Sequence, residues 1–130
     1  MRALLVVVLA LIAVACDESL TGPTVPLEQT FVLAPGESAR VEDITVRFAR
    51  VANDSRCPAD VVCVTAGDAQ VEVVVIASGR SRTYVLRTAG MKPVRHDDYA
   101  IHLVKLEPYP FSTRTIQPEE YRVTLRVTKT

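Results

Sequence analysis

The chain has 130 residues, of which 48% are hydrophobic, 5% aromatic and 23% charged, and its 15 basic and 15 acidic residues give a formal net charge of zero. This length allows one domain, and the composition excludes a disordered chain. Because Lys and Arg form no cluster along the sequence, binding to a nucleic-acid backbone is not expected. The apolar residues are rich in Val, Ile and Leu, which favours strands over helices.

The amino terminus has the pattern of a bacterial export signal. A basic residue precedes an uninterrupted apolar run over residues 3–15. As a helix this run would rise about 20 Å, which is short of a hydrocarbon core of about 30 Å, so it indicates a cleaved signal rather than a membrane span. The run ends in the sequence AVAC at Cys16, which resembles a bacterial lipobox. We therefore expect residues 1–15 to be a lipoprotein signal peptide and Cys16 to carry the lipid.

The same residues leave an alternative open. Ala13 stands where a lipobox usually has Leu, and the segment from Ala13 to Ala15 also fits an ordinary A-x-A cleavage site that would release a soluble protein. Acylation is favoured because an unmodified Cys16 would be an exposed thiol in an oxidising compartment. Residues 16–27 contain Gly and Pro, which indicates a lipidated cysteine followed by a flexible tether.

From Thr30 onward, apolar and polar residues alternate with a period of two, which predicts strands with one buried face. The clearest run is 120–128, in which Val123, Leu125 and Val127 alternate with polar residues. Turn sequences separate the runs, and no stretch has the period of an amphipathic helix. The strands are predicted at 29–34, 38–42, 44–52, 69–77, 81–88, 98–107 and 120–128.

Two of these runs change phase along their length. In the run 44–52, Phe48 and Val51 are out of phase with each other. In the run 98–107, Leu103 and Leu106 are out of phase in the same way. An inserted residue reverses the faces of a strand, so we expect a β-bulge in each run. About seven short strands with this spacing predict an all-β fold, a single immunoglobulin-like Greek-key β-sandwich that occupies residues 28–130.

The segment 54–68 joins two strong strands and contains Cys57 and Cys63, the only cysteines after Cys16. An exported chain meets an oxidising compartment, so we expect this pair to form a disulfide bond across five residues. Loop-closure entropy assigns so short a loop roughly 2–2.5 kcal/mol of stabilisation. The bond would also fix the shape of the loop.

This cysteine loop also carries a resemblance. It reads DSRCP from Asp54, then a Val and Cys63, and then AG ending at Gly67. The pattern resembles a family of uncharacterised bacterial lipoproteins and secreted proteins in which the loop reads DSRCP…VxCxWAG, and the similarity extends from Thr30 to the end of the chain. Thr65 stands where the family often has Trp, so an aromatic anchor of the relatives would be missing here. The resemblance implies a fold and no established activity.

Carboxylates and a histidine in two loops leave a metal site open as an alternative. Asp54, Asp60 and Asp68 bracket the cysteine loop and have oxygen ligands of the kind that calcium prefers, although their spacing does not match an EF-hand. His96 and Asp98 could add a ligand or a general base if the two loops meet in space. The simpler interpretation is that these residues form turns, so we expect no metal and no cofactor.

Two surface features could bind a partner. Tyr109 and Phe111 form an apolar stretch in a loop, which could contact a protein or pack onto the sandwich edge. Tyr121, at the approach to the last strand, resembles a tyrosine corner whose phenol caps a loop. Several arginines could line one sheet face and bind an anionic partner, or pair with glutamates across strands. These arginines are Arg47, Arg50, Arg80, Arg82, Arg87, Arg122 and Arg126.

No catalytic motif accompanies these features, since GxSxG and HExxH are absent from the sequence. We therefore predict a non-catalytic lipoprotein of the bacterial cell envelope that faces the periplasm or the exterior. Its partners would be the lipid bilayer, through acylated Cys16, and an envelope protein or polysaccharide. The alternatives are a metal-binding protein or small metal-dependent hydrolase that uses loops 54–68 and 95–98, and a protease inhibitor that presents the stapled loop.

Overall fold

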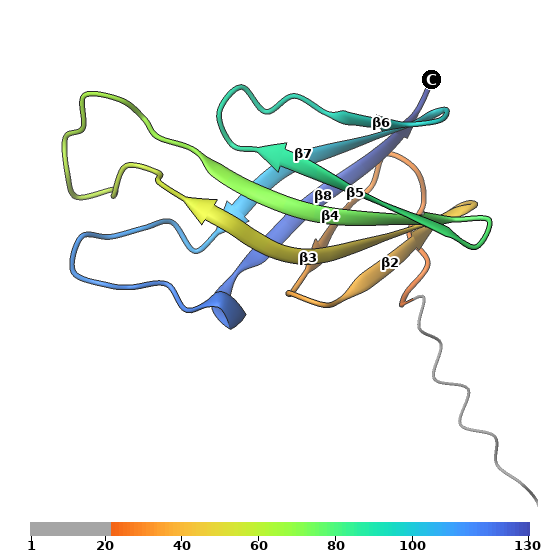
Figure 1. Cartoon of the computed structure of the whole chain (residues 1–130), viewed down its shortest axis with the longest axis horizontal. Coiled ribbons are helices and arrows are strands. Elements are labelled where there is room, and N and C mark those ends of the chain that lie inside the picture. The colour runs from red at the N-terminus through yellow and green to blue at the C-terminus, as the bar shows by residue number, and fades with distance from the viewer. Residues whose placement is uncertain (1–21) are drawn as a thin grey trace, which may run out of the picture.

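The computed structural model describes residues 22–130, so the expected signal peptide and Cys16 lie outside the described residues. The described chain forms two antiparallel sheets of four strands each (Figure 1), which confirms the predicted all-β sandwich. None of its helices has the length and apolar character needed to cross a bilayer. The elements are β1 (Thr30–Leu33), β2 (Ser38–Val41), β3 (Ile44–Asp54), β4 (Ala69–Ala77), β5 (Arg80–Arg87), β6 (Val94–His96), β7 (Tyr99–Glu107), the 3-10 helix η1 (Pro118–Glu120) and β8 (Arg122–Lys129).

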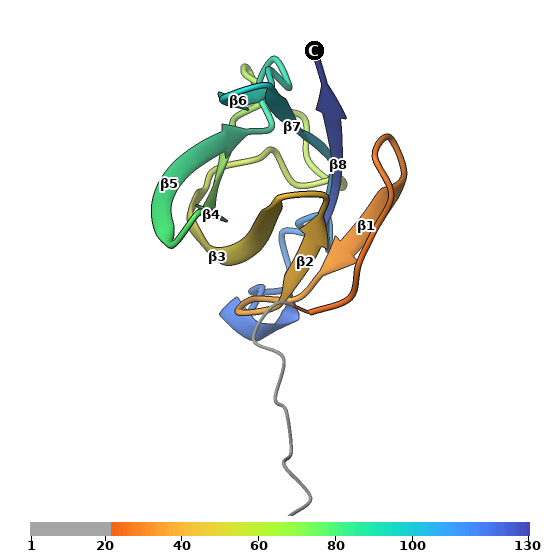
Figure 2. The ribbon, with the colours of Figure 1, turned by 90° about the vertical axis from the view of Figure 1, so that its right-hand side faces the viewer.

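The strand order is simple. One sheet has the order β1-β8-β7-β6 and the other has the order β2-β3-β4-β5, and Figure 2 shows them as two layers. Hydrogen-bonded neighbours follow one another along the chain, except that β1 pairs with β8. This pairing ties the start and the end of the domain into one sheet. The sequence did not predict β6, because its three residues are too few for an alternation to be detected.

The core lies between the two sheets and follows the predicted alternation. Phe48 of β3, Val73 of β4 and, in the other sheet, Leu125 of β8 are all fully buried and belong to one core cluster. Burying such a side chain contributes roughly 1.5–3 kcal/mol. The largest fully buried side chains are Phe48, Ile44, Leu86, Ile101, Leu125, Val41, Val46, Val71, Val73, Val75, Val123 and Val127.

Both predicted bulges are confirmed. The pairing of β3 with β4 shifts between Phe48 and Arg50, and the pairing of β7 with β8 shifts between Leu103 and Lys105. The second shift keeps Leu103 and Leu106 in the core although they differ in phase. β7 can therefore bury both of its ends against the opposite sheet.

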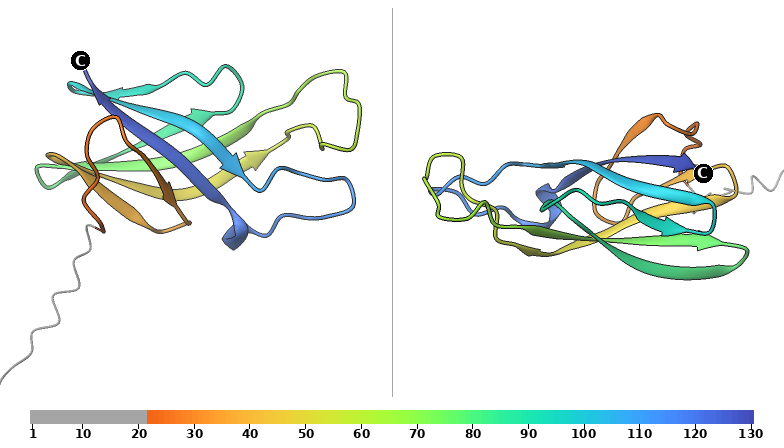
Figure 3. Two further views of the ribbon diagram at one scale, coloured as in Figure 1. Left: turned by 180° about the vertical axis from the view of Figure 1, so that it is seen from behind. Right: turned by 90° about the horizontal axis from the view of Figure 1, so that it is seen from above.

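The two ends of the sandwich differ. The tight turns β2–β3, β4–β5 and β6–β7 lie at one end, and the longer loops β3–β4, β5–β6 and β7–β8 lie at the other (Figure 3). The second end, formed by residues 55–68, 88–93 and 108–121, is called the loop end below. The chain enters at the first end, where Pro23 and Val25 form backbone hydrogen bonds with Arg40 of β2. This first end is called the tether end.

Part of the segment that the sequence assigns to the tether lies against the sandwich. Thr24 forms a β-bridge with Arg40, and Val25 and Leu27 pack against the core. Residues 24–27 therefore belong to the folded domain.

Candidate functional site

Asp54 and Arg56 of the cysteine loop form a buried clasp at the loop end. The Arg56 side chain is among the few buried charges, and its residue is 8% exposed. Its guanidinium donates to both oxygens of Asp54, with Nε–Oδ1 at 2.8 Å and Nη2–Oδ2 at 2.7 Å. The same group donates to the carbonyl oxygens of Leu106 at 2.9 Å and Pro108 at 3.0 Å. Arg56 therefore ties the β3–β4 loop to the end of β7.

Tyr121 completes the clasp from the approach to β8. Its hydroxyl donates to Oδ2 of Asp54 at 2.8 Å, so the phenol caps the β3–β4 loop through a side chain. Burial and the hydrogen bond to Asp54 raise the pKa of Tyr121 to about 12. Burial also raises the pKa of Asp54, but the hydrogen bonds from Arg56 and Tyr121 outweigh it and hold that pKa below its usual range. Asp54 is an ionised structural anchor with both oxygens occupied.

The base of the cysteine loop is closed by hydrogen bonds that explain the rest of its sequence pattern. The backbone nitrogen and the hydroxyl of Ser55 donate to the carbonyl oxygen of Asp68, at 2.7 and 2.9 Å. The backbone nitrogen of Cys57 donates to the carbonyl oxygen of Ala66 at 2.9 Å. Gly67 has φ +69°, and a Cβ there would lie 1.8 Å from the Ser55 carbonyl oxygen. Only glycine fits this close approach.

The tip of the loop is held at two further places. The sulfurs of Cys57 and Cys63 lie 2.05 Å apart, which is bonding distance. Asp60 accepts hydrogen bonds from the backbone nitrogen of Ser112, at 2.9 Å, and from its hydroxyl. The Ala59 backbone nitrogen donates to the same β7–β8 loop at 2.9 Å. The β3–β4 and β7–β8 loops therefore form one connected unit.

Large apolar side chains are exposed on this unit. Val62 and Val64 are fully exposed, while Tyr109 and Phe111 are 54% and 51% exposed. The sequence pointed to the two aromatic residues but not to the valines, because a Val-rich stretch is normally read as buried. The available signal was that Val62 and Val64 flank Cys63 in a loop. The residues of this surface, called the apolar tip below, are Val61, Val62, Val64, Tyr109 and Phe111.

A cleft of about 610 Å³ lies beside the apolar tip, between the three loops. Arg56 and Gly67 line it from the cysteine loop, Met91 from the β5–β6 loop, and Lys105 and Tyr109 from β7 and the loop after it. The guanidinium carbon of Arg56 lies 5.4 Å from the centre of the Tyr109 ring, in cation–π range. The loop end thus combines a protruding apolar surface with an adjacent concave one.

The aspartates of the cysteine loop are all occupied by protein donors. Asp54 is held by the clasp and Asp60 by Ser112. Asp68 accepts from Arg87 Nε at 2.6 Å and from the backbone nitrogen of Ala89 at 2.9 Å. Burial raises the pKa of Asp68, but these donors outweigh it and the pKa lies below its usual range. The three carboxylates therefore anchor loops in this structure.

The two loops of the predicted metal site do not meet. His96 pairs with Tyr99 at the start of β7, whereas the clasp of Asp54 contacts the end of that strand. β7 has nine residues and is therefore roughly 25 Å long. Asp98 lies with His96 at the tether end. Within residues 22–130, no group of three or more His, Cys, Asp and Glu side chains could hold a metal ion.

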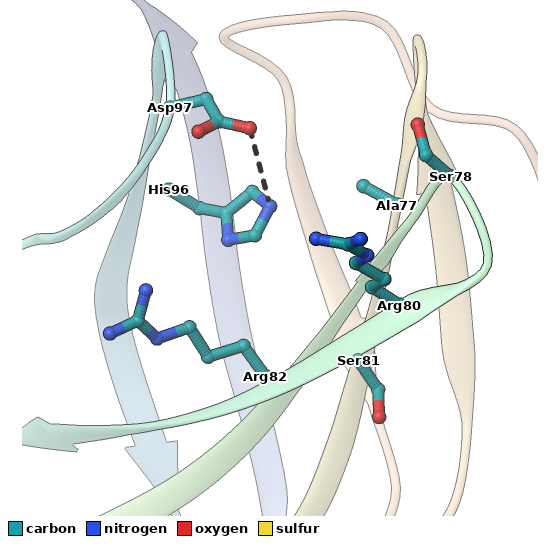
Figure 4. A pocket seen from close by; sticks show the side chains of 7 residues that line it. All are labelled: Ala77, Ser78, Arg80, Ser81, Arg82, His96 and Asp97. Atoms are coloured by element: carbon teal, nitrogen blue, oxygen red, sulfur yellow. Dashed lines mark ion pairs between the residues drawn. The ribbon is translucent and has the colours of Figure 1, made fainter.

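The arginines are distributed over several places rather than along one face. Arg50 and Arg87 pair with carboxylates at 2.9 and 2.6 Å, and Arg122 donates to backbone carbonyl oxygens. Arg80 and Arg82 lie in a second cleft, at the tether end (Figure 4). The arginines therefore do not line one face, and of the two alternatives the pairing with a glutamate across strands holds for Arg50 and Glu72.

The two ends offer different chemistry. The loop end has an apolar surface on loops whose shape is fixed by the disulfide, the clasp and the Asp60 contacts. Exposed apolar side chains on a fixed backbone are typical of a binding surface. Comparisons with protein-family models, curated proteins and solved structures found no match to this chain.

Proposed function

We propose that this protein is a lipid-anchored, non-catalytic component of the bacterial cell envelope that binds a protein partner through its apolar tip. The observation that carries the proposal is the exposure of Val62, Val64 and Phe111 on two loops that are bonded to each other. Most of the large exposed apolar side chains of the described chain lie in the loops of this end. Because these loops are already ordered, little entropy is lost when a partner binds.

The anchor in this proposal rests on the sequence. The lipobox at Cys16 and the signal at residues 1–15 support export and acylation. Two or three acyl chains would hold the protein firmly on a bilayer. Since the described chain begins at the tether end, the apolar tip would be presented away from the membrane, toward the periplasm or the exterior.

Within this proposal the sandwich is immunoglobulin-like with Greek-key character. The strand order supports that assignment. The strands β6, β7 and β8 follow one another, and β1 comes from a distant part of the chain to lie beside β8. Tyr121 precedes β8 as the tyrosine corner of such sandwiches does, but its hydroxyl bonds the Asp54 side chain of a distant loop rather than the backbone a few residues upstream.

Site-specific photo-crosslinking in bacteria that produce the full chain tests the proposed binding surface. A photoreactive amino acid replaces Val62 in one variant and Val32 in a control, since Val32 is 60% exposed on β1, outside the three loops of the loop end. We expect one discrete protein adduct from position 62 and none from position 32. Purified protein should compete for the adduct, whereas the Val62→Asp variant should not. Equal adducts from both positions, or no adduct from position 62, would contradict the proposal.

A protease inhibitor is a second candidate, favoured by a specific observation. Val62 and Val64 are fully exposed on either side of Cys63, in a loop held by the disulfide and by the clasp. Such a loop could occupy the substrate cleft of a protease while resisting cleavage. The expected result is inhibition of a protease with apolar specificity that is lost on reduction. Rapid cleavage of the oxidised loop without inhibition would exclude this candidate.

A further inference from the structure

The second cleft, at the tether end, has a volume of about 580 Å³ and lies between the β4–β5 and β6–β7 hairpins (Figure 4). Its wall on β5 is formed by Arg80 and Arg82. In the antiparallel pairing Arg82 lies opposite Val75 and Arg80 lies opposite Ala77. Because paired residues share a face and Val75 faces the core, both arginines start from the inner face of β5. Two inward-facing positions of β5 are therefore occupied by arginine.

The two arginines lie at an open edge of the sandwich. β5 and β6 are the edge strands of their sheets, and they are not hydrogen-bonded to each other. Along the inner face of β5, from the end of the strand to its start, Leu86 is fully buried, Tyr84 is half-buried, and Arg82 and Arg80 are exposed. The inner face of β5 thus changes from apolar to cationic as the strand approaches the tether end.

The opposite wall of the cleft is His96 of β6, whose ring has a fixed orientation. Its Nδ1 lies 2.8 Å from the Tyr84 hydroxyl, and the two rings meet edge to face with their centres 5.8 Å apart. The other nitrogen, Nε2, lies 3.7 Å from a carboxylate oxygen of Asp97. Figure 4 shows the guanidinium groups of Arg80 and Arg82, which come from the β4–β5 hairpin, on either side of this ring. Three nitrogen-bearing side chains thus line one cleft.

The two arginines of the cleft also lack counter-charges. In the described residues no carboxylate lies within 4.0 Å of the Arg80 or Arg82 guanidinium, whereas Arg50, Arg56 and Arg87 each have one. Arg82 instead lies over the Tyr84 ring, 5.7 Å from its centre. The lining of the cleft contains a single acidic residue. The local charge is therefore suited to an anion.

We propose that this cleft binds a phosphate group, either free or in a lipid headgroup. Two guanidinium groups can each donate paired N–H bonds to phosphate oxygens. The headgroup source rests on the proposed lipid anchor, since that anchor would turn the tether end toward the bilayer. The phosphate site itself does not depend on the anchor.

Titration of the purified intact protein in a nonionic detergent tests the site. The probes are inorganic phosphate, short-chain phosphatidylglycerol below its micellar concentration, and short-chain phosphatidylcholine, with binding measured by calorimetry. We expect saturable binding of inorganic phosphate, of phosphatidylglycerol or of both. Binding of inorganic phosphate alone would identify the free anion as the source, and binding of phosphatidylglycerol alone would identify the headgroup. Absence of saturable binding for every probe would overturn the proposal.

Matched variants locate the binding. Arg82→Ser and Arg80→Ser should each weaken it about tenfold, as expected for the loss of a charge-assisted hydrogen bond. Arg47→Ser removes the same charge from an exposed position on β3, outside the cleft, and should change the affinity by less than about twofold. Equal weakening by all three variants would indicate nonspecific attraction and overturn the site. The crosslinking test at Val62 involves the other end of the molecule, so the two proposals can fail separately.

Discussion

Arg56 is the residue that connects the cysteine loop with the rest of the loop end. Arg56→Lys keeps the charge but loses the planar fork that reaches Asp54 and the Leu106 carbonyl together. We expect the free energy of unfolding, measured with urea, to fall by about 2–4 kcal/mol, because buried acceptors lose their donor. The matched variant Arg50→Lys alters an exposed ion pair and should change the free energy of unfolding much less, because solvent screens this pair. Similar losses for the two variants would argue against the clasp.

Asp54 gives the clasp a defined dependence on pH. Because its pKa is lower in the folded protein than the ordinary value of about 3.9, its stabilising contribution is present above that value and is lost as the pH falls through the folded pKa. We expect the difference in unfolding free energy between the natural protein and Asp54→Asn to be largest above about pH 5 and to shrink below about pH 4. A difference that stays constant from pH 6 to pH 2.5 would contradict this role.

At the scale of elements, the cysteine loop is stabilised at its base by hydrogen bonds and at its tip by a disulfide. Replacing both Cys57 and Cys63 with Ser should lower the free energy of unfolding by about 2 kcal/mol, since the loop-closure entropy of the unfolded chain is restored. The Val62 crosslink should weaken as well, because the tip is less ordered. Circular dichroism should remain unchanged, since the strands do not depend on this bond. An unchanged unfolding free energy would mean that the clasp alone orders the loop.

The strands could be predicted because most of them have one face on the core. Alternation located β4 and β7 within a residue, and the phase changes at Phe48 and Leu103 located the bulges. β3 continues to Asp54, beyond its predicted end, because its last residues pair with β4 without being buried. A strand must be long enough for the alternation of apolar and polar residues to be detected. The three-residue β6 is too short and was not predicted.

The candidate sites were harder to predict than the strands. The sequence identified the cysteine loop. Two contacts of that loop, from Arg56 to the Leu106 carbonyl and from Tyr121 to Asp54, join residues that are 50 and 67 positions apart in the sequence. Residue spacing does not reveal contacts over such separations. Arg82 could have been placed on the inner face, since it shares parity with Leu86. The charge of Arg82 favours the opposite assignment, because arginine side chains usually lie on the solvent face.

At the scale of the whole molecule, the sandwich separates two kinds of surface. The apolar tip lies at the loop end and the cationic cleft lies at the tether end. Figure 1 shows that the described chain begins at the tether end. The strands between them, such as the nine-residue β7, hold these surfaces roughly 25 Å apart. An anchored protein with this arrangement would contact lipid phosphates at one end and a protein partner at the other.

Intact mass spectrometry of the protein extracted from bacterial membranes tests the lipid anchor and the disulfide most directly. We expect a chain that begins at Cys16 and carries acyl groups there, and that gains the mass of two hydrogens on reduction as the Cys57–Cys63 bond opens. A protein that begins elsewhere, that carries no lipid at Cys16, or whose mass does not change on reduction would contradict this expectation.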